Sequence, residues 1–498
     1  MKKFLIIWVI LIAIIIIGCK ALSQEQIQDE LMLKEKAEEQ HTSEDLGLSN
    51  HGEPINKYII TVDYDKKENT LKGHEKIIYH NNGNKIVDNI ILYLYPNMYK
   101  NLETVPAIGS AEKSYPEGFN SGYIKLSNIK VDSRDIDKSI EEEFSGIYIE
   151  FPLEKPVKQN KSIEIDMDFM VKIPMSTTRF GQYKDITQFT YWYPILAIEE
   201  DGEWQIRDYS KIGESNYSDI ADYNVEIILP EEDKVAATGS IISERQSSEK
   251  GYKHVKIKAE KVRDFAWVCS PNFIIEENII DGIKIKNYYT PKNEVLGCKA
   301  VEIGADVLSY FNEKFGPYPY DEFTIVETYL TGGGMEYPQL IALGQNHYKD
   351  MDKLVSVIAH EGAHQWWYVG VGNDEHESPW LDEGFATYST QLYLAYRAKE
   401  DKKLNELMAK YGTLQSPDIA IDASVSCFSN WKDYNDVIYK KGALVLHKLR
   451  NDVGDDKFFE IMQTYYNRYK FKNAKTSDFL TIVEEVADKA AAERIDLH

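Results

Sequence analysis

Two histidines and a glutamate stand close together in an apolar segment, in the order His360-Glu361-x-x-His364. The flanking residues are mostly apolar: Leu354, Val355, Val357, Ile358, Trp366 and Trp367. Burying ionisable groups without partners costs several kcal/mol, so a compensating partner is expected. Residues four apart on a helix lie on one face, so both imidazoles can reach one metal ion with Glu361 beside them.

A third ligand follows nineteen residues after His364, at Glu383. A helix is predicted to begin just before it, because Ser378 is a suitable N-cap and Pro379 suits the first helical position. Asp382 and Glu383 then fall in the opening turns, where the helix dipole favours negative charge. Two histidines and one glutamate leave a coordination position open for water, which is typical of a catalytic rather than a structural zinc site.

The ligand types indicate the metal and its chemistry. Two imidazoles and a carboxylate favour zinc, although the same set also holds ferrous iron in oxygenases. The glutamate inside the histidine motif favours hydrolysis with a single zinc ion. Zinc lowers the pKa of bound water to about 7, and Glu361 can then take the proton of the water and pass it to a leaving amine.

The elements that must position these residues form two blocks. A chain of 498 residues is too long for one core and is expected to form two or three domains. Strand alternation begins at Tyr58, Ile60, Val62 and Tyr64, and 53–275 is predicted to be a mainly β domain.

Helical spacing predominates after about residue 280, and 276–480 is predicted to be a second, mostly helical domain that carries the metal motif. The final segment, 481–498, is interpreted as a C-terminal tail or a truncated helical region. The expected helices are Ala300–Phe311, Lys353–Tyr368, Leu381–Ala398, Asp401–Tyr411, Gly442–Val453 and Lys457–Tyr469.

The segment His360–Glu383, with Trp-Leu-Asp-Glu-Gly-Phe-Ala at 380–386, resembles the aminopeptidase N family of zinc metallopeptidases. This family of gluzincins also contains a leukotriene hydrolase. Gly-Gly-Met-Glu-Tyr-Pro at 333–338 resembles its exopeptidase signature, and Tyr-Lys-Lys-Gly-Ala at 439–443 resembles its Tyr-x-Lys-Gly segment. The resemblance implies an N-terminal all-β domain with a saddle-like sheet, followed at 276–480 by a thermolysin-like α+β zinc peptidase domain that is mostly helical.

The resemblance also implies roles for residues outside the metal motif. Glu336 would hold the ammonium group of a free peptide N-terminus by a charge-assisted hydrogen bond. Gly333, Gly334 and Met335 would bind the substrate strand, because a bare backbone edge can pair with a peptide. Tyr439 would donate a hydrogen bond to the oxyanion of the tetrahedral intermediate. The usual Asn of the signature is Tyr337 in this chain, which puts the shape of that subsite in doubt.

The function predicted from these motifs is a zinc-dependent aminopeptidase acting on peptides with a free N-terminus. A thermolysin-like zinc endopeptidase is one alternative, since it would not need Glu336 as an amine anchor. A catalytically inactive, zinc-stabilised surface binding protein is another, although Glu361 and Tyr439 are both present. Nucleic acid is not an expected partner, because the net charge is −24 and phosphate binding needs clustered Lys and Arg.

The first nineteen residues are interpreted as a lipoprotein-type signal segment. Lys2 and Lys3 precede an apolar run at 4–17, which is followed by Gly18 and Cys19. Fourteen helical residues span about 21 Å, short of the roughly 30 Å of bilayer hydrocarbon. The run therefore favours a secretory signal with lipidation at Cys19, and an uncleaved membrane anchor is the alternative.

The segment 20–52 is polar and is expected to be a stalk, so the protein is predicted to lie outside the cytoplasm, tethered to a bacterial membrane. Three cysteines remain beyond Cys19, so at most one disulfide could form among them and a thiolate metal site is not expected.

Overall fold

The computed structural model describes residues 54–106, 111–136, 146–207, 210–214 and 216–497. The signal-type segment 1–19, with Cys19, and the polar stalk 20–52 lie outside these residues, so the interpretations of them stay predictions. Ile55–His498 form one compact unit. Within the described ranges, no helix is both long enough and apolar enough to cross a membrane.

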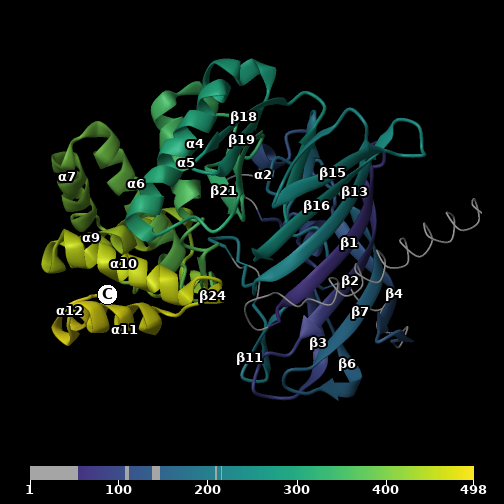
Figure 1. Cartoon of the computed structure of the whole chain (residues 1–498), viewed down its shortest axis with the longest axis horizontal. Coiled ribbons are helices and arrows are strands. Elements are labelled where there is room, and N and C mark those ends of the chain that lie inside the picture. The colour runs from purple at the N-terminus through teal and green to yellow at the C-terminus, as the bar shows by residue number, and fades with distance from the viewer. Residues whose placement is uncertain (1–53, 107–110, 137–145, 208–209, 215, 498) are drawn as a thin grey trace, which may run out of the picture. The chain divides into compact units, whose positions relative to one another are not determined.

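The part of the unit up to Ser270, here called the β region, is built from sheets (Figure 1). Its strands are β1 (Asn56–Asp65), β2 (Thr70–His80), β3 (Val87–Tyr93), β4 (Tyr123–Val131), β5 (Arg134–Asp135), β6 (Tyr148–Val157), β7 (Ser162–Lys172), β8 (Gly181–Tyr183), β9 (Ile186–Phe189), β10 (Ile195–Leu196), β11 (Ile198–Glu200), β12 (Glu203–Gln205), β13 (Ala221–Pro230), β14 (Lys234–Ala237), β15 (Ser240–Gln246), β16 (Tyr252–Val262) and β17 (Trp267–Ser270). Among the described residues of this region, two short helices interrupt the strands, η1 (Tyr95–Lys100) and α2 (Ala111–Ser114).

Eight of these strands form one sheet in the order β15-β16-β13-β1-β2-β7-β4-β5. The alternation predicted for β1 is confirmed, since Tyr58, Ile60, Val62 and Tyr64 are all buried against the core of the β region. A second sheet, β14-β17-β9-β8, contributes to a small apolar cluster shared with the rest of the unit. The β region therefore packs directly on the region that follows.

The part from β18 onward, here called the helical region, carries most of the helices. Its helices are η2 (Pro291–Asn293), α4 (Glu294–Phe315), η3 (His347–Lys349), α5 (Met351–Ala363), α6 (Trp380–Ala398), α7 (Asp401–Gly412), η4 (Val425–Cys427), α8 (Trp431–Tyr434), the π-helix η5 (Asn435–Lys441), α9 (Gly442–Val453), α10 (Asp455–Tyr469), α11 (Thr476–Val486) and α12 (Lys489–Glu493). Its strands are β18 (Ile274–Ile280), β19 (Ile283–Tyr289), β20 (Glu322–Thr328), β21 (Gly334–Tyr337), β22 (Leu340–Gly344), β23 (Val371–Gly372) and β24 (Lys472–Asn473). The predicted order, a β part followed by a mostly helical part, is confirmed, whereas the thermolysin-like detail stays a prediction.

Helix α5 ends earlier than its apolar pattern predicted. The expected helix Lys353–Tyr368 stops at Ala363, and the chain then folds back, with Val369 N–H donating to the carbonyl of His364 at 2.9 Å. The apolar pattern continues past the end of the helix because Trp366 and Trp367 are fully buried in the core without being helical.

Helix α6 begins at Trp380 with Pro379 as its N-cap, so the expected N-cap at Ser378 is not the one observed. Asp382 and Glu383 still fall in its first turn, as predicted.

The last segment, interpreted from the sequence as a tail or truncated region, continues α11 and contains α12, whose Ala491 is buried. Cys269, Cys298 and Cys427 are all free thiols, so the disulfide that the sequence left open is not formed among them.

Candidate active site

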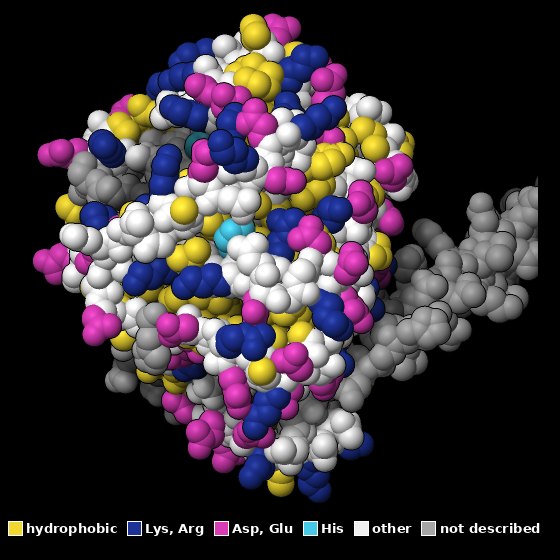
Figure 2. Space-filling view, turned by 90° about the vertical axis from the view of Figure 1, so that its left-hand side faces the viewer, with side chains coloured by type: hydrophobic (Ala, Val, Ile, Leu, Met, Phe, Trp, Pro, Cys, Tyr) yellow, Lys and Arg dark blue, Asp and Glu magenta, His cyan; other side chains and the backbone are white. Residues whose placement is uncertain are grey.

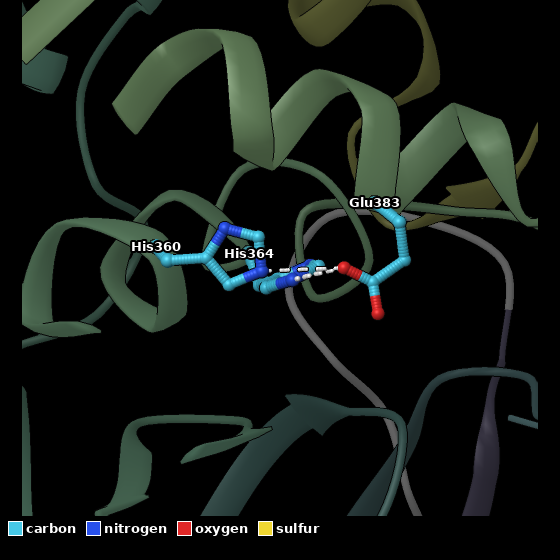
Figure 3. Close-up of side chains that lie close together, drawn as sticks. All are labelled: His360, His364 and Glu383. Atoms are coloured by element: carbon cyan, nitrogen blue, oxygen red, sulfur yellow. Dashed lines mark hydrogen bonds and ion pairs between the residues drawn. The ribbon is translucent and has the colours of Figure 1, made fainter. Parts of the chain in front are cut away.

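The three predicted metal ligands converge on one point between α5 and α6 (Figure 3). His360 lies in the last turn of α5 and His364 caps its end, while Glu383 comes from the first turn of α6. One carboxylate oxygen of Glu383 lies 3.2 Å from Nε2 of His360 and 3.4 Å from Nε2 of His364. Figure 3 shows both imidazole rings directed at this oxygen, with the second oxygen turned away from them.

These distances fit a single tetrahedral metal ion. Ligand atoms bound to zinc at about 2.0–2.2 Å lie about 3.3–3.5 Å apart at the tetrahedral angle. The separations of the Glu383 oxygen from the two histidine nitrogens match that edge length. Three protein ligands leave one position open, so the donor set suits a catalytic ion.

The orientation of His364 is fixed from its other ring nitrogen. Nδ1 of His364 lies 3.0 Å from the carbonyl oxygen of Trp367. A carbonyl only accepts, so Nδ1 carries a proton, and Nε2 is the nitrogen that faces Glu383 and would bind a metal once deprotonated. Burial disfavours a charged His364, yet the surrounding carboxylates, Glu336 first, outweigh it and raise the pKa of His364 well above its usual value.

The predicted general base, Glu361, lies beside the ligands and next to a second carboxylate. Glu336, Glu361 and His364 have side-chain oxygen or nitrogen atoms within 4.8 Å of one another. Burial first, and the charge of Glu336 second, raise the pKa of Glu361 well above its usual value. Two adjacent buried carboxylates repel each other unless a proton or a cation lies between them. The pair is therefore a binding place for a positive group.

Burial and hydrogen bonding shift the pKa of Glu383 in opposite directions. Burial alone would raise the pKa of its carboxyl, but the hydrogen bonds from His360 and His364 outweigh burial and lower this pKa below its usual value. Glu383 is thus held in its ionised form, which is the form that binds a metal.

Strand β21 carries residues of the predicted exopeptidase signature. Because side chains alternate along a strand, some of them face the pocket and the others face the core. Gly334 and Glu336 face α5, and both line the pocket together with Gly333. Met335 and Tyr337 point the other way, into a buried apolar cluster. The structure therefore does not bring Met335 to the pocket, because successive side chains of a strand face opposite sides.

Tyr337 is also away from the site. Its hydroxyl accepts a hydrogen bond from the Thr190 hydroxyl at 2.6 Å. Its replacement of the usual Asn therefore changes the packing between the β region and β21, and does not place a ring in the pocket.

Tyr439 reaches the ligands from the π-helix η5. Its hydroxyl donates to Oε1 of Glu383, and its ring lies nearly parallel to that of His360, with centroids 6.0 Å apart. A π-helical turn inside α-helical surroundings often re-aims a side chain at a functional site. Burial, and then the charge of Glu383, raise the pKa of Tyr439 well above its usual value, so its hydroxyl stays a donor.

One pocket of about 490 Å³ extends from the metal ligands along α5 and α6. The predicted residues that line it are Gly333, Gly334, Glu336, His360, Glu361, His364, Glu383 and Tyr439. Residues without a predicted role also line it, among them Arg179, Glu214, His347, Lys353, Thr387, Thr390, Tyr411, Trp431 and Lys440.

Arg179 and Glu214 are the most informative of these additions, since both belong to the β region. The Arg179 guanidinium forms a bidentate ion pair with the Glu214 carboxylate, which also accepts from Nδ2 of Asn216 at 3.2 Å. Burial raises the pKa of Glu214 to about 8, although Arg179 opposes this shift. Neither residue stands in a motif, so only the packing of the β region on the helical region could place them here.

The outer face at this end of the helical region carries both signs of charge. Figure 2 shows Lys and Arg side chains interspersed with Asp and Glu, with hydrophobic side chains between them. The net charge of −24 therefore does not form a single acidic field on this face.

Comparison with known proteins agrees with the geometry. Residues 299–496 match the model of the peptidase family M1 domain. The aminopeptidase 2 of Candida albicans is 26% identical over 234 residues, covering 43% of this chain and 25% of that protein. The glutamyl aminopeptidase of Bos taurus is 27% identical over 233 residues, covering 43% of this chain and 24% of that protein. The chain thus spans about a quarter of the length of these curated relatives.

Solved structures show the same fold. An M1 zinc metallopeptidase from Deinococcus radiodurans superposes with a TM-score of 0.63 at 16% identity, covering 88% of this chain and 91% of that chain. A two-domain M1 zinc metallopeptidase bound to L-tryptophan gives a TM-score of 0.64, also at 16% identity, over 88% of this chain and 92% of that chain. Residues 299–496 are therefore similar to the peptidase family M1 domain, and the resemblance to the aminopeptidase N family is confirmed.

Proposed function

We propose that this chain is a zinc-dependent aminopeptidase that removes N-terminal residues from peptides. The observation that carries the proposal is the convergence in one pocket of the metal ligands His360, His364 and Glu383 with the carboxylates of Glu361 and Glu336. Relatives named aminopeptidases, and a related M1 structure described as bound to a Tyr-Ser-Ala substrate, support the substrate class.

The proposed roles follow from where each side chain lies. Zinc held by the three ligands would polarise the scissile carbonyl and lower the pKa of the attacking water. Glu361 takes a proton from that water and passes it to the leaving amine, for which its raised pKa suits it. Tyr439 donates its hydroxyl hydrogen bond to the oxyanion that forms in the tetrahedral state.

Glu336 makes the enzyme recognise the amino end of the substrate, so that cleavage occurs at the first peptide bond. An ammonium group between Glu336 and Glu361 would relieve the repulsion of the two carboxylates and form a charge-assisted hydrogen bond. Strand β21 is the edge of the sheet β18-β19-β20-β22-β21, so its outer side is available to pair with an extended peptide. Anchored at its amine, such a peptide presents its first peptide bond to the metal ligands.

A panel of aminoacyl fluorogenic substrates tests the proposal with wild type and Glu361→Gln. We expect the variant to keep its zinc and to lose nearly all turnover. Equal cleavage of free-amine and N-acetylated peptides would instead indicate an endopeptidase. A zinc-loaded wild type that cleaves no reporter would indicate a surface binding protein.

The variant Glu336→Ala tests the amine anchor separately. We expect it to weaken the binding of free-amine substrates much more than that of acetylated peptides. A similar loss on both substrates would refute the anchor while leaving hydrolysis intact.

We also propose that the enzyme is tethered outside the cytoplasm through a lipid on Cys19. The basic Lys2-Lys3 pair, the apolar run at 4–17 and the Ile-Ile-Gly-Cys sequence at 16–19 support this proposal. Metabolic labelling with a fatty-acid analogue should mark the wild type and not Cys19→Ala. Equal labelling of both proteins would contradict it.

A further inference from the structure

A strained residue lies immediately beyond the metal ligands. Tyr368 has a φ of +114°, whereas the other non-glycine residues with positive φ in the described part of the chain lie between 47° and 65°. The latter values belong to the left-handed region that single residues visit, but φ near +114° is adopted readily only by glycine. Strain of this kind persists only where the surroundings impose it, and it concentrates at functional sites.

The strained φ of Tyr368 affects the orientation of the metal ligand His364. The carbonyl of Trp367 and the N–H of Tyr368 belong to the same planar peptide, so φ of Tyr368 sets how that plane is turned. This carbonyl is the one that accepts from Nδ1 of His364 at 3.0 Å. A change in φ of Tyr368 would therefore move the acceptor that fixes the tautomer and the ring orientation of His364.

The β region holds Tyr368 in this conformation through two consecutive residues. The Tyr368 hydroxyl donates to Oδ2 of Asp264 at 2.5 Å, and Nε of Arg263 donates to the carbonyl of Tyr368 at 2.5 Å. Asp264, Arg263 and Tyr368 are all buried. The N–H of Tyr368 donates to the carbonyl of Val371 at 2.9 Å, so every polar group of the strained residue is engaged.

We propose that Tyr368 and Asp264 are positioning residues of the metal site: their hydrogen bond holds the strained peptide whose carbonyl orients His364. The inference rests on the proposed function only in taking His364 as a metal ligand. It assigns the β region a part in the metal site, because Asp264 lies between β16 and β17. Arg263 binds the carbonyl of the next peptide, that of Tyr368, but it also binds Asn473 and the carbonyls of Ser218 and Lys472, so its replacement would test the fold as a whole.

The test compares two replacements of Tyr368. Tyr368→Phe keeps the ring and the strain and loses the hydrogen bond to Asp264, so we expect zinc affinity to fall about 10- to 100-fold. Tyr368→Gly also loses the hydrogen bond to Asp264. Glycine adopts a φ near +114° without strain, however, so the peptide between residues 367 and 368 has no strain to relieve by rotating. We therefore expect Tyr368→Gly to bind zinc more tightly than Tyr368→Phe, although it loses a buried ring.

Zinc affinity is measured by competition with a chelator, and the absorption spectrum of the Co²⁺-loaded protein reports the geometry of the ligands. Tyr64→Phe is the matched control, since Tyr64 is a buried tyrosine of β1 whose hydroxyl bonds Thr187 at 2.9 Å, far from the ligands in sequence and on another element. We expect the control to keep the zinc affinity and the cobalt spectrum of the wild type.

Asp264→Ala supplies a second variant that is expected to fold, because it removes a buried carboxylate whose Oδ1 has no partner among the described residues. Combined with Tyr368→Phe, it should weaken zinc binding no more than either change alone, as expected of two ends of one bond.

Two results would overturn the proposal. Tyr368→Phe could bind zinc within twofold of the wild type with an unchanged cobalt spectrum, or Tyr368→Gly could bind more weakly than Tyr368→Phe, which would assign the role to ring packing. A wild type that binds no zinc would overturn the proposed function itself, and the positioning role with it.

Discussion

Replacing Gly334 with alanine should displace the proposed general base, Glu361, while the metal ligands stay in place. A Cβ added at Gly334 would lie 2.6 Å from both Cγ and Oε1 of Glu361 and 2.7 Å from its Cδ. The backbone of Gly334 is not in the positive-φ region, so an alanine there is not strained in itself. The clash falls on the Glu361 side chain, which must move.

The size of that movement sets the expected loss. Non-bonded carbon atoms prefer separations of about 3.5–4.0 Å, so Glu361 must retreat by about 1 Å. A misplacement of about 1 Å in a reacting group costs on the order of 10²-fold in rate. This corresponds to about 2.7 kcal/mol of transition-state stabilisation. We therefore expect kcat of Gly334→Ala to fall by about two orders of magnitude, with zinc bound as in the wild type.

Gly333→Ala is the matched control, because an added Cβ there would lie 3.9 Å from Oε1 of Glu361, an ordinary contact. Steady-state hydrolysis of an aminoacyl reporter, with the zinc content measured in parallel, should show a loss for Gly333→Ala at least tenfold smaller than for Gly334→Ala. Equal losses for the two variants, or a wild-type kcat for Gly334→Ala, would refute the placement of Glu361 against β21.

Three further outcomes are expected. Tyr439→Phe keeps the ring beside His360 and removes only the hydroxyl, so kcat should fall about 10²–10³-fold with KM little changed, and a matching rise in KM would contradict an oxyanion role. Burial raises the pKa of Glu214 from its ordinary 4.5 to about 8, so its protonated form stabilises the fold at low pH and that contribution is lost as pH rises through about 8. Urea unfolding at several pH values should therefore show a flatter profile between about pH 5 and 8 for Glu214→Gln, and an unchanged profile would refute the shift. Chelation should abolish turnover and lower the Tm, with one equivalent of zinc restoring both, whereas a need for two equivalents would contradict a single-ion site.

The metal ligands could be predicted from the sequence because their geometry is local. His360 and His364 are one helical turn apart, and Glu383 lies in the first turn of the next helix. Spacing along a helix fixes which side chains share a face, so three residues on two neighbouring helices could be placed without knowing the rest of the fold. The three side chains do come together as predicted.

The direction of a side chain is harder to predict from sequence where it depends on strand register or tertiary contacts. The motif places Met335 beside Glu336 in sequence, but strand alternation directs the Met335 side chain into the core. The apolar pattern does not show where α5 ends, because the buried Trp366 and Trp367 prolong a helical pattern after the helix has ended. The φ of Tyr368 could not be predicted either, since its residue type disfavours it and contacts from Asp264 impose it.

Charge balance in the pocket explains why so many acidic groups are buried there. Glu214, Glu336, Glu361 and Glu383 all line it, and each carboxylate removed from water needs a positive partner. Arg179 supplies one positive charge, and the proposed zinc ion would supply two. Lys353 and Lys440 line the pocket as well, but the adjacent carboxylates of Glu336 and Glu361 still repel each other, and the ammonium group of a peptide would relieve that repulsion. An acetylated peptide brings no such charge, so its poorer binding would follow from the electrostatics of the whole pocket and not from Glu336 alone.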